Sequence, residues 1–224
     1  MIKKLIYILI LFVFFINSAI AQTQNAYLNY NDSQYAFKSG DKQKFLTNAY
    51  VNMLLWEKAQ TTEDKSFYQQ EAMRYFYLLS KIDSKSIDAQ IGLARIYDEY
   101  KLDKFAKEHF FIAYDFDNRN PKMNFHFANF YYKRNDLMNA LFYYKRAHQY
   151  GFSKNYEVNY KLGVIYEKLA DIESAKKFYA NASKLKPQNQ ELINKIRLLD
   201  ELKYDESQYY LKIDFNFREE KETG

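Results

Sequence analysis

The sequence contains no cysteine, and its 224 residues include five glycines and two prolines. Without cysteine, no disulfide can cross-link the chain and no lipid can be attached to an amino-terminal cysteine, so the fold depends on packing alone. Turn-rich all-β proteins and disordered chains both use more glycine and proline than this. The scarcity of both residues therefore favours a folded helical protein.

The chain also lacks a strong charge of either sign. It has 33 basic and 28 acidic side chains, a formal net charge of +5, and two of the basic ones (Lys3 and Lys4) fall in the leader described next. An excess this small gives no reason to expect a nucleic-acid partner. Aromatic residues, in contrast, are abundant, with 23 tyrosines and 19 phenylalanines.

Residues 1–21 have the pattern of a secretory signal peptide. The basic pair Lys3-Lys4 precedes 12 apolar residues (5–16), and small residues stand at a cleavage site after Ala21. The alternative is an uncleaved membrane anchor, but a bilayer core needs about 20 apolar residues in a helix. We therefore expect an exported protein, periplasmic or extracellular, that meets a membrane only through a partner.

One pattern occurs three times, at intervals of 34 and 35 residues. In each copy a large apolar residue and a small one are followed by an aromatic residue, an alanine, a second aromatic residue and a second alanine, always at the same offsets. The copies are Leu93-Ala94, Tyr97, Ala106, Phe110 and Ala113; Phe127-Ala128, Tyr131, Ala140, Tyr144 and Ala147; and Leu162-Gly163, Tyr166, Ala175, Tyr179 and Ala182. The spacing within each copy is helical, and the repetition indicates an array of helix pairs.

This pattern resembles the tetratricopeptide repeat (TPR), a family of 34-residue helix–turn–helix units. The resemblance covers residues 87–189 in three units, which are 87–120, 121–154 and 156–189. It implies an all-α, right-handed solenoid of helix pairs. Small residues in the pattern permit two helices to approach closely, and large ones fill the space beside them, so we expect the aromatic stripe to be core.

The flanking regions complete the expected domain organisation. Residues 22–86 are expected to form a helical region with one degenerate repeat, because Ala72, Phe76 and Leu79 lie 34 residues before their counterparts in the next copy. Residues 190–203 continue the helical spacing. We expect them to form a capping helix, since an array needs a terminal element with a polar outer face.

The period changes in the tail, residues 204–224. Between Tyr209 and Arg218 apolar and polar residues alternate, which is typical of an extended strand with one apolar face. A lone strand cannot satisfy its backbone, so it would lie back along its own solenoid or add to a sheet edge of a partner. The alternative is that the segment extends the capping helix and frays.

No catalytic or cofactor motif is present in the sequence. The glycines do not form a phosphate-binding loop, and the three histidines fall in different expected helices, whereas a metal site needs several convergent ligands. Acidic residues such as Asp98, Glu99 and Glu167 have the spacing of solvated helix faces with i,i+3 or i,i+4 pairs. We therefore expect neither an enzyme nor a protein with a metal or a cofactor.

The resemblance implies a binding surface instead. In TPR proteins the first helices of successive units line a concave face, which binds an extended peptide or a helix of a partner. Carried over to this sequence, that face contains Arg95, Phe125, Asn129, Tyr132, Lys133, Tyr160 and Val164. Aromatic and arginine residues are frequent anchors of interfaces. Asn129 alone matches the carboxylate clamp of the chaperone-binding members, so such a clamp is not expected.

Two functions follow from these expectations. In the first, the protein is an exported TPR module that binds a peptide segment or a helix of another protein in its concave groove. In the second, it is a structural subunit of a cell-envelope assembly, held through its convex face or through its tail.

The leader leads to a first prediction. The protein purified from its native host should begin at Gln22, because signal peptidase removes the segment that ends in Ala21. Mass spectrometry of the intact protein and of its amino-terminal peptide would show this. Recovery of a chain that still carries Met1 would identify the apolar segment as an anchor.

Overall fold

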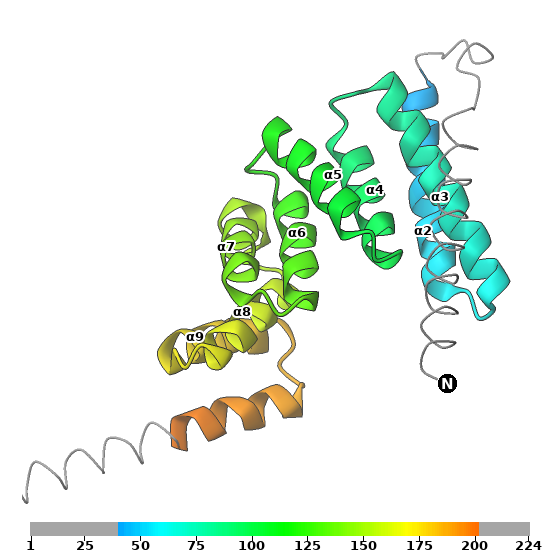
Figure 1. The fold of residues 1–224 in the computed structure, drawn as a ribbon. Coiled ribbons are helices and arrows are strands. Elements are labelled where there is room, and N and C mark those ends of the chain that lie inside the picture. Colours follow the sequence, from blue (N-terminus) through cyan, green and yellow to red (C-terminus); the bar gives the residue numbers. More distant parts are fainter. Residues whose placement is uncertain (1–39, 202–224) are drawn as a thin grey trace, which may run out of the picture. The chain divides into compact units, whose positions relative to one another are not determined.

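The computed structural model describes residues 40–201, and within them every regular element is a helix (Figure 1). The helices are α2 (Asp41–Lys58), α3 (Thr62–Ile82), α4 (Ile87–Glu99), α5 (Asp103–Phe116), α6 (Pro121–Lys133), α7 (Leu137–Ala147), a π-helical turn η2 (His148–Phe152), α8 (Tyr156–Lys168) and α9 (Ile172–Leu185), followed by a helix over residues 190–201. The prediction of an all-α helical repeat is confirmed.

The expected signal peptide (1–21) and the alternating part of the tail lie outside the described residues. Between residues 40 and 201, no helix combines the length and the apolar character that a membrane span requires.

The chain divides into two compact units, and the boundary falls inside α4, between Gly92 and Leu93. In the first unit α2 and α3 lie side by side (Figure 1). The residues of the degenerate repeat in α3 (Ala72, Phe76 and Leu79) are fully buried. Phe76 lies against the start of α4, where a Cβ added at Gly92 would be 2.4 Å from its ring. The first turns of α4 therefore pack with the helices that precede them.

In the second unit the repeated pattern forms the core. On the second helices α5, α7 and α9, all nine pattern residues have an exposed fraction of 1% or less. The aromatic residues of the first helices are less uniform, because Tyr131 is buried whereas Tyr97 and Tyr166 are half-buried. Tyr97 stacks on His109, and Tyr166 stacks on Phe178. These two rings are thus only partly buried, which differs from the expectation that the whole stripe is core.

Local sequence signals explain where these helices begin. Asn120 and Asn155 cap α6 and α8, and each side chain accepts a hydrogen bond from a backbone N–H three residues later at 3.0 Å. Asp136 and Asp171 cap α7 and α9 in the same way, as expected for short polar side chains at this position. Asp103 differs, because it is already the first residue of α5 and its carboxylate is bonded to an arginine of α6.

The turn between the two helices of each pair has one conformation in all three repeats. Lys101, Asn135 and Ala170 occupy equivalent positions, and their φ angles are 60°, 57° and 58°. Left-handed backbone is costly for residues with a Cβ, so packing of the helices rather than residue type imposes this turn. Gly151 in η2 has φ 146°, a conformation suited to glycine, and η2 accommodates the extra residue of the middle repeat.

Two buried asparagines hold the loop that precedes each of two first helices. Asn124 of α6 donates to the carbonyl oxygens of Asn118 and Asn120 at 2.9 and 2.8 Å. Asn159 of α8 donates in the same way to the carbonyl oxygens six and four residues earlier, both at 2.8 Å. Both side chains are fully buried, so these bonds satisfy amide N–H groups that have no access to water.

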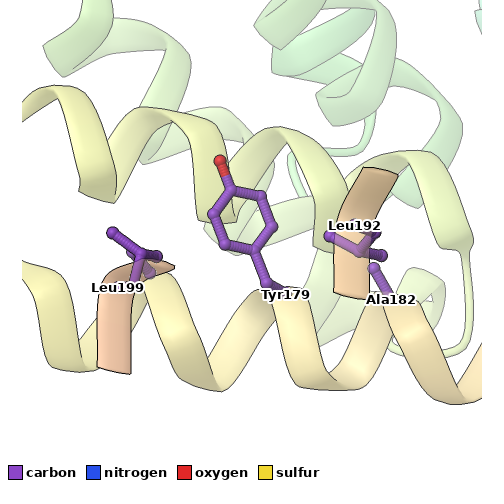
Figure 2. Packing of buried hydrophobic residues seen from close by; sticks show 5 residues of the cluster. Tyr179, Ala182, Leu192 and Leu199 are labelled. Atoms are coloured by element: carbon purple, nitrogen blue, oxygen red, sulfur yellow. The ribbon is translucent and has the colours of Figure 1, made fainter. Parts of the chain in front are cut away.

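The helix over residues 190–201 covers the last repeat, as Figure 2 shows. Leu192 and Leu199 are buried against Tyr179 and Ala182 of α9, which is what a capping helix requires. Ile193, which the helical spacing placed among the apolar residues, is instead 39% exposed. Fewer of the apolar residues in this helix are therefore buried than their spacing indicated.

The close contact inside the last repeat gives a second prediction. A Cβ added at Gly163 would lie 2.5 Å from Cδ1 of Tyr179, so Gly163→Leu should reduce the free energy of unfolding by about 1–3 kcal/mol through overpacking. Gly40→Leu is the control, because nothing lies within 4 Å of that position. Chemical denaturation monitored by circular dichroism would compare the variants. Equal midpoints would show that α8 and α9 do not meet as described.

Candidate functional site

The expected binding residues lie on α4, α6 and α8, the first helices of their pairs. We call the surface that they form the first-helix face; it consists of Arg95, Phe125, Asn129, Tyr132, Lys133, Tyr160 and Val164. Lys133 is exposed and the other six residues are half-buried. Each of them therefore remains accessible to a partner, and what each can do depends on the contacts that it already makes.

Lys133 already has two partners on the preceding first helix. Its Nζ donates to Asp98 at 2.9 Å and to Glu99 at 2.7 Å. Arg134 also forms an ion pair with Asp98 at 2.7 Å. Asp98 is 6% exposed, so the expectation that it belongs to a solvated helix face is wrong. It can be buried because Lys133, the last residue of α6, and Arg134, the C-cap residue after it, compensate its charge across the contact between repeats.

Asn129 is also engaged within the protein. Its Oδ1 accepts a hydrogen bond from the hydroxyl of Tyr144 in α7. Tyr144 is fully buried, and burial raises the pKa of its phenol far above the ordinary value. The phenol therefore stays protonated and keeps donating to Asn129. The asparagine that matched a carboxylate clamp in the sequence thus serves the packing of its own repeat.

The aromatic rings of the face are supported from behind by other rings. Phe125 lies edge-on to Tyr144 at a centroid distance of 6.3 Å. Tyr160 stacks on Tyr156 and lies against Tyr179, each at 5.9 Å. These contacts cover part of each ring, and both side chains remain partly exposed. Val164 packs against the same cluster as Tyr160.

Tyr132 is the point at which α6 and α8 meet on this face. The Nζ of Lys161 lies 4.1 Å from the centroid of its ring, and the Nζ of Lys168 lies 5.6 Å from it. The sequence reasoning placed Lys168 on the inner face but not among the seven expected binding residues, and it missed Lys161. They are seven residues apart, which is two helical turns, and that spacing would have placed them on one side of α8.

The sequence placed Glu167, like Asp98, on a solvated helix face, but in the structure its carboxylate is bonded within the protein. Its carboxylate accepts a hydrogen bond from the hydroxyl of Tyr179 at 2.5 Å and forms an ion pair with Lys195 at 3.1 Å. Lys195 belongs to the 190–201 helix, so this carboxylate joins α8, α9 and the capping helix.

His126 lies beside the first-helix face and is kept neutral by its surroundings. Burial is the main cause of a pKa well below the ordinary value of this imidazole. The positive charges of Arg95, Lys122 and Lys133 lower it further. His109 and His148 also have lowered pKa values because of burial. In the part of the chain that the structure describes, no three potential metal ligands converge.

Comparison with known proteins identifies the fold. No family model and no curated protein sequence matches the chain, but solved structures do. YrrB, described as a TPR protein with an unusual peptide-binding site, matches with a TM-score of 0.53 and 16% identity, over 70% of this chain and 76% of that chain. The chain has the tetratricopeptide-repeat fold.

Two further structures show the same likeness. PilF of Pseudomonas aeruginosa matches with a TM-score of 0.61 and 18% identity, over 77% of this chain and 73% of that one. A crystal structure of MamA matches with a TM-score of 0.53 and 20% identity, over 74% of this chain and 88% of that one. At these identities the likeness establishes the TPR fold and no more.

The second helices carry a different exposed surface. Phe111 of α5 and Met138 and Phe142 of α7 are 46%, 67% and 48% exposed. The aromatic side chains Tyr114 and Tyr143 connect the two helices, with ring centroids 6.0 Å apart. We call this apolar surface the second-helix face.

The lowered histidine pKa values give a third prediction. As the pH falls below about 6.5, the ordinary pKa of histidine, the unfolded chain binds protons that folded His126 does not bind. Stability should therefore decrease between pH 7 and pH 5.5. His126→Gln should make this decrease smaller, while His109 and His148 maintain part of it. Melting temperatures at both pH values would measure the effect, and equal slopes for the two proteins would contradict it.

Proposed function

We propose that this protein is an exported protein-interaction module whose first-helix face binds an extended segment or a helix of a partner protein. The observation that carries the proposal is the set of three partly exposed rings, Phe125, Tyr132 and Tyr160, which two consecutive first helices supply. Binding energy at interfaces is concentrated in such aromatic anchors.

Preorganisation supports the same conclusion. Tyr144 packs behind Phe125 and Tyr132, and Tyr156 and Tyr179 pack against Tyr160. A ring held from behind loses little conformational freedom when a partner covers its exposed surface, so less of the binding energy is lost to ordering. Neighbouring donors such as Lys161 supply polar contacts beside the apolar ones.

The TPR fold and the leader support the class of protein and its location. YrrB, which shares the fold, is described as having a peptide-binding site. The basic, apolar and small residues of the segment that ends in Ala21 support export to the periplasm or the extracellular space. A metal or a cofactor has no role in this proposal.

The second-helix face supports a second candidate function. Phe111, Met138 and Phe142 are large apolar residues that remain exposed on neighbouring helices, and apolar patches of this kind are frequent in permanent assemblies. In that case the protein would be a structural subunit of a cell-envelope assembly.

Photo-crosslinking in the native host gives the fourth prediction and separates the two candidates. Benzoylphenylalanine at position 160 or at position 142 preserves a large ring, whereas alanine at Tyr160 would also remove packing against Tyr156 and Tyr179. Irradiated cells should yield protein adducts from position 160. Adducts from position 142 alone would favour the structural subunit, and no adducts from either position would contradict both candidates.

A further inference from the structure

We propose that the first-helix face selects an acidic peptide segment, whose carboxylates dock at Lys161 and Lys168 beside the ring of Tyr132. This inference rests on the proposed function and adds to it the chemical class of the partner. It follows from a comparison of the charged groups that the chain uses internally with those that it leaves available.

Three carboxylates next to the face are already compensated. Asp98 pairs with Lys133 and Arg134, and Glu99 pairs with Lys133. Glu167 is held by Lys195 and by the hydroxyl of Tyr179. A partner therefore does not meet these three acidic groups as free acceptors.

Donor groups remain available on this face. Within residues 40–201 no carboxylate lies within 4.0 Å of the ammonium groups of Lys161 and Lys168, which lie over the ring of Tyr132. In the same range, no hydrogen bond within the protein involves the hydroxyls of Tyr132 and Tyr160. These four groups can donate to a partner, and a negatively charged acceptor gains the strongest bonds from them.

Both positive charges lie around the ring of Tyr132, with the Nζ of Lys161 at 4.1 Å and the Nζ of Lys168 at 5.6 Å from its centroid. Carboxylates of one peptide segment that covers this ring would form a charge-assisted contact with each lysine. Lys133, in contrast, already has two carboxylates and offers no such site.

Acidic side chains of a peptide fit this surface better than an isolated small anion does. Partly exposed rings accompany the two lysines, because Phe125 and Tyr132 both lie against Tyr144 and Tyr160 directly precedes Lys161 on α8. A peptide with apolar residues next to its carboxylates would cover these rings and also neutralise the lysines. Glu157, one turn before Lys161 on α8, is exposed and should weaken such binding through like-charge repulsion.

The fifth prediction uses a matched pair of peptides and nuclear magnetic resonance titration of the full chain. The first probe is an acetylated and amidated octapeptide with glutamate at every second position and leucine or serine between. The control probe has glutamine in place of each glutamate. The glutamate peptide should bind about tenfold more tightly, equivalent to about 1.4 kcal/mol, and this preference should shrink as salt is added.

Variants locate the effect on the protein. The double change Lys161→Gln with Lys168→Gln should abolish the preference for glutamate, whereas Glu157→Gln should increase it. The control Lys145→Gln with Lys184→Gln removes the same charge from exposed positions on second helices and should leave the preference unchanged. Circular dichroism would verify that all variants keep their helicity.

Each outcome decides the question. A preference lost equally in the control variant would reflect net charge and would overturn the proposed site. Equal binding of both probes would overturn the acidic preference but leave the proposed function standing, and no binding of either would overturn both. A synthetic peptide of residues 204–224 that binds more tightly than the glutamate probe would identify the chain's own tail as the occupant and overturn an external partner.

Discussion

The close contact between a small residue on one helix and an aromatic ring on the next supports the rest of the structure. Gly163 leaves room for the ring of Tyr179, and in the preceding repeat Ala128 and Tyr144 occupy the same positions of the pattern. Because the helices meet at this distance, the phenol hydroxyls reach across to the first helices, where they bond Glu167 and Asn129. The same two tyrosines therefore fill the core with their rings and bond residues of the first helices with their hydroxyls.

The helices and their core could be predicted from the sequence because both depend on local spacing. The buried second-helix residues follow a period that is visible in the chain, and caps such as Asn120 and Asp136 stand directly before the helices that they start. The state of Asp98 could not be predicted in this way. Its partners Lys133 and Arg134 are about one repeat away in the chain, and only the packing of one repeat on the next shows that its charge is compensated.

The candidate site was predicted in part for the same reason. The resemblance to TPR proteins indicated which helices would carry the face, and the structure places its residues on those helices. Whether each residue is available to a partner depends on the contacts between helices. Asn129 and Lys133 bond within the protein, whereas the ammonium group of Lys161, omitted at first, lies over the ring of Tyr132. A single sequence shows the identity of a side chain but not which groups its polar atoms bond in the folded protein.

The carboxylate of Glu167 links the capping helix to the charge of the first-helix face. Lys195 compensates it from the capping helix. If that helix detached, Glu167 would lose a counter-charge and would add an uncompensated negative charge beside the first-helix face. Loss of the cap would therefore expose Tyr179 and Ala182 and also make the first-helix face less positive. Under the proposed preference for acidic peptides, damage to the capping helix would then weaken binding.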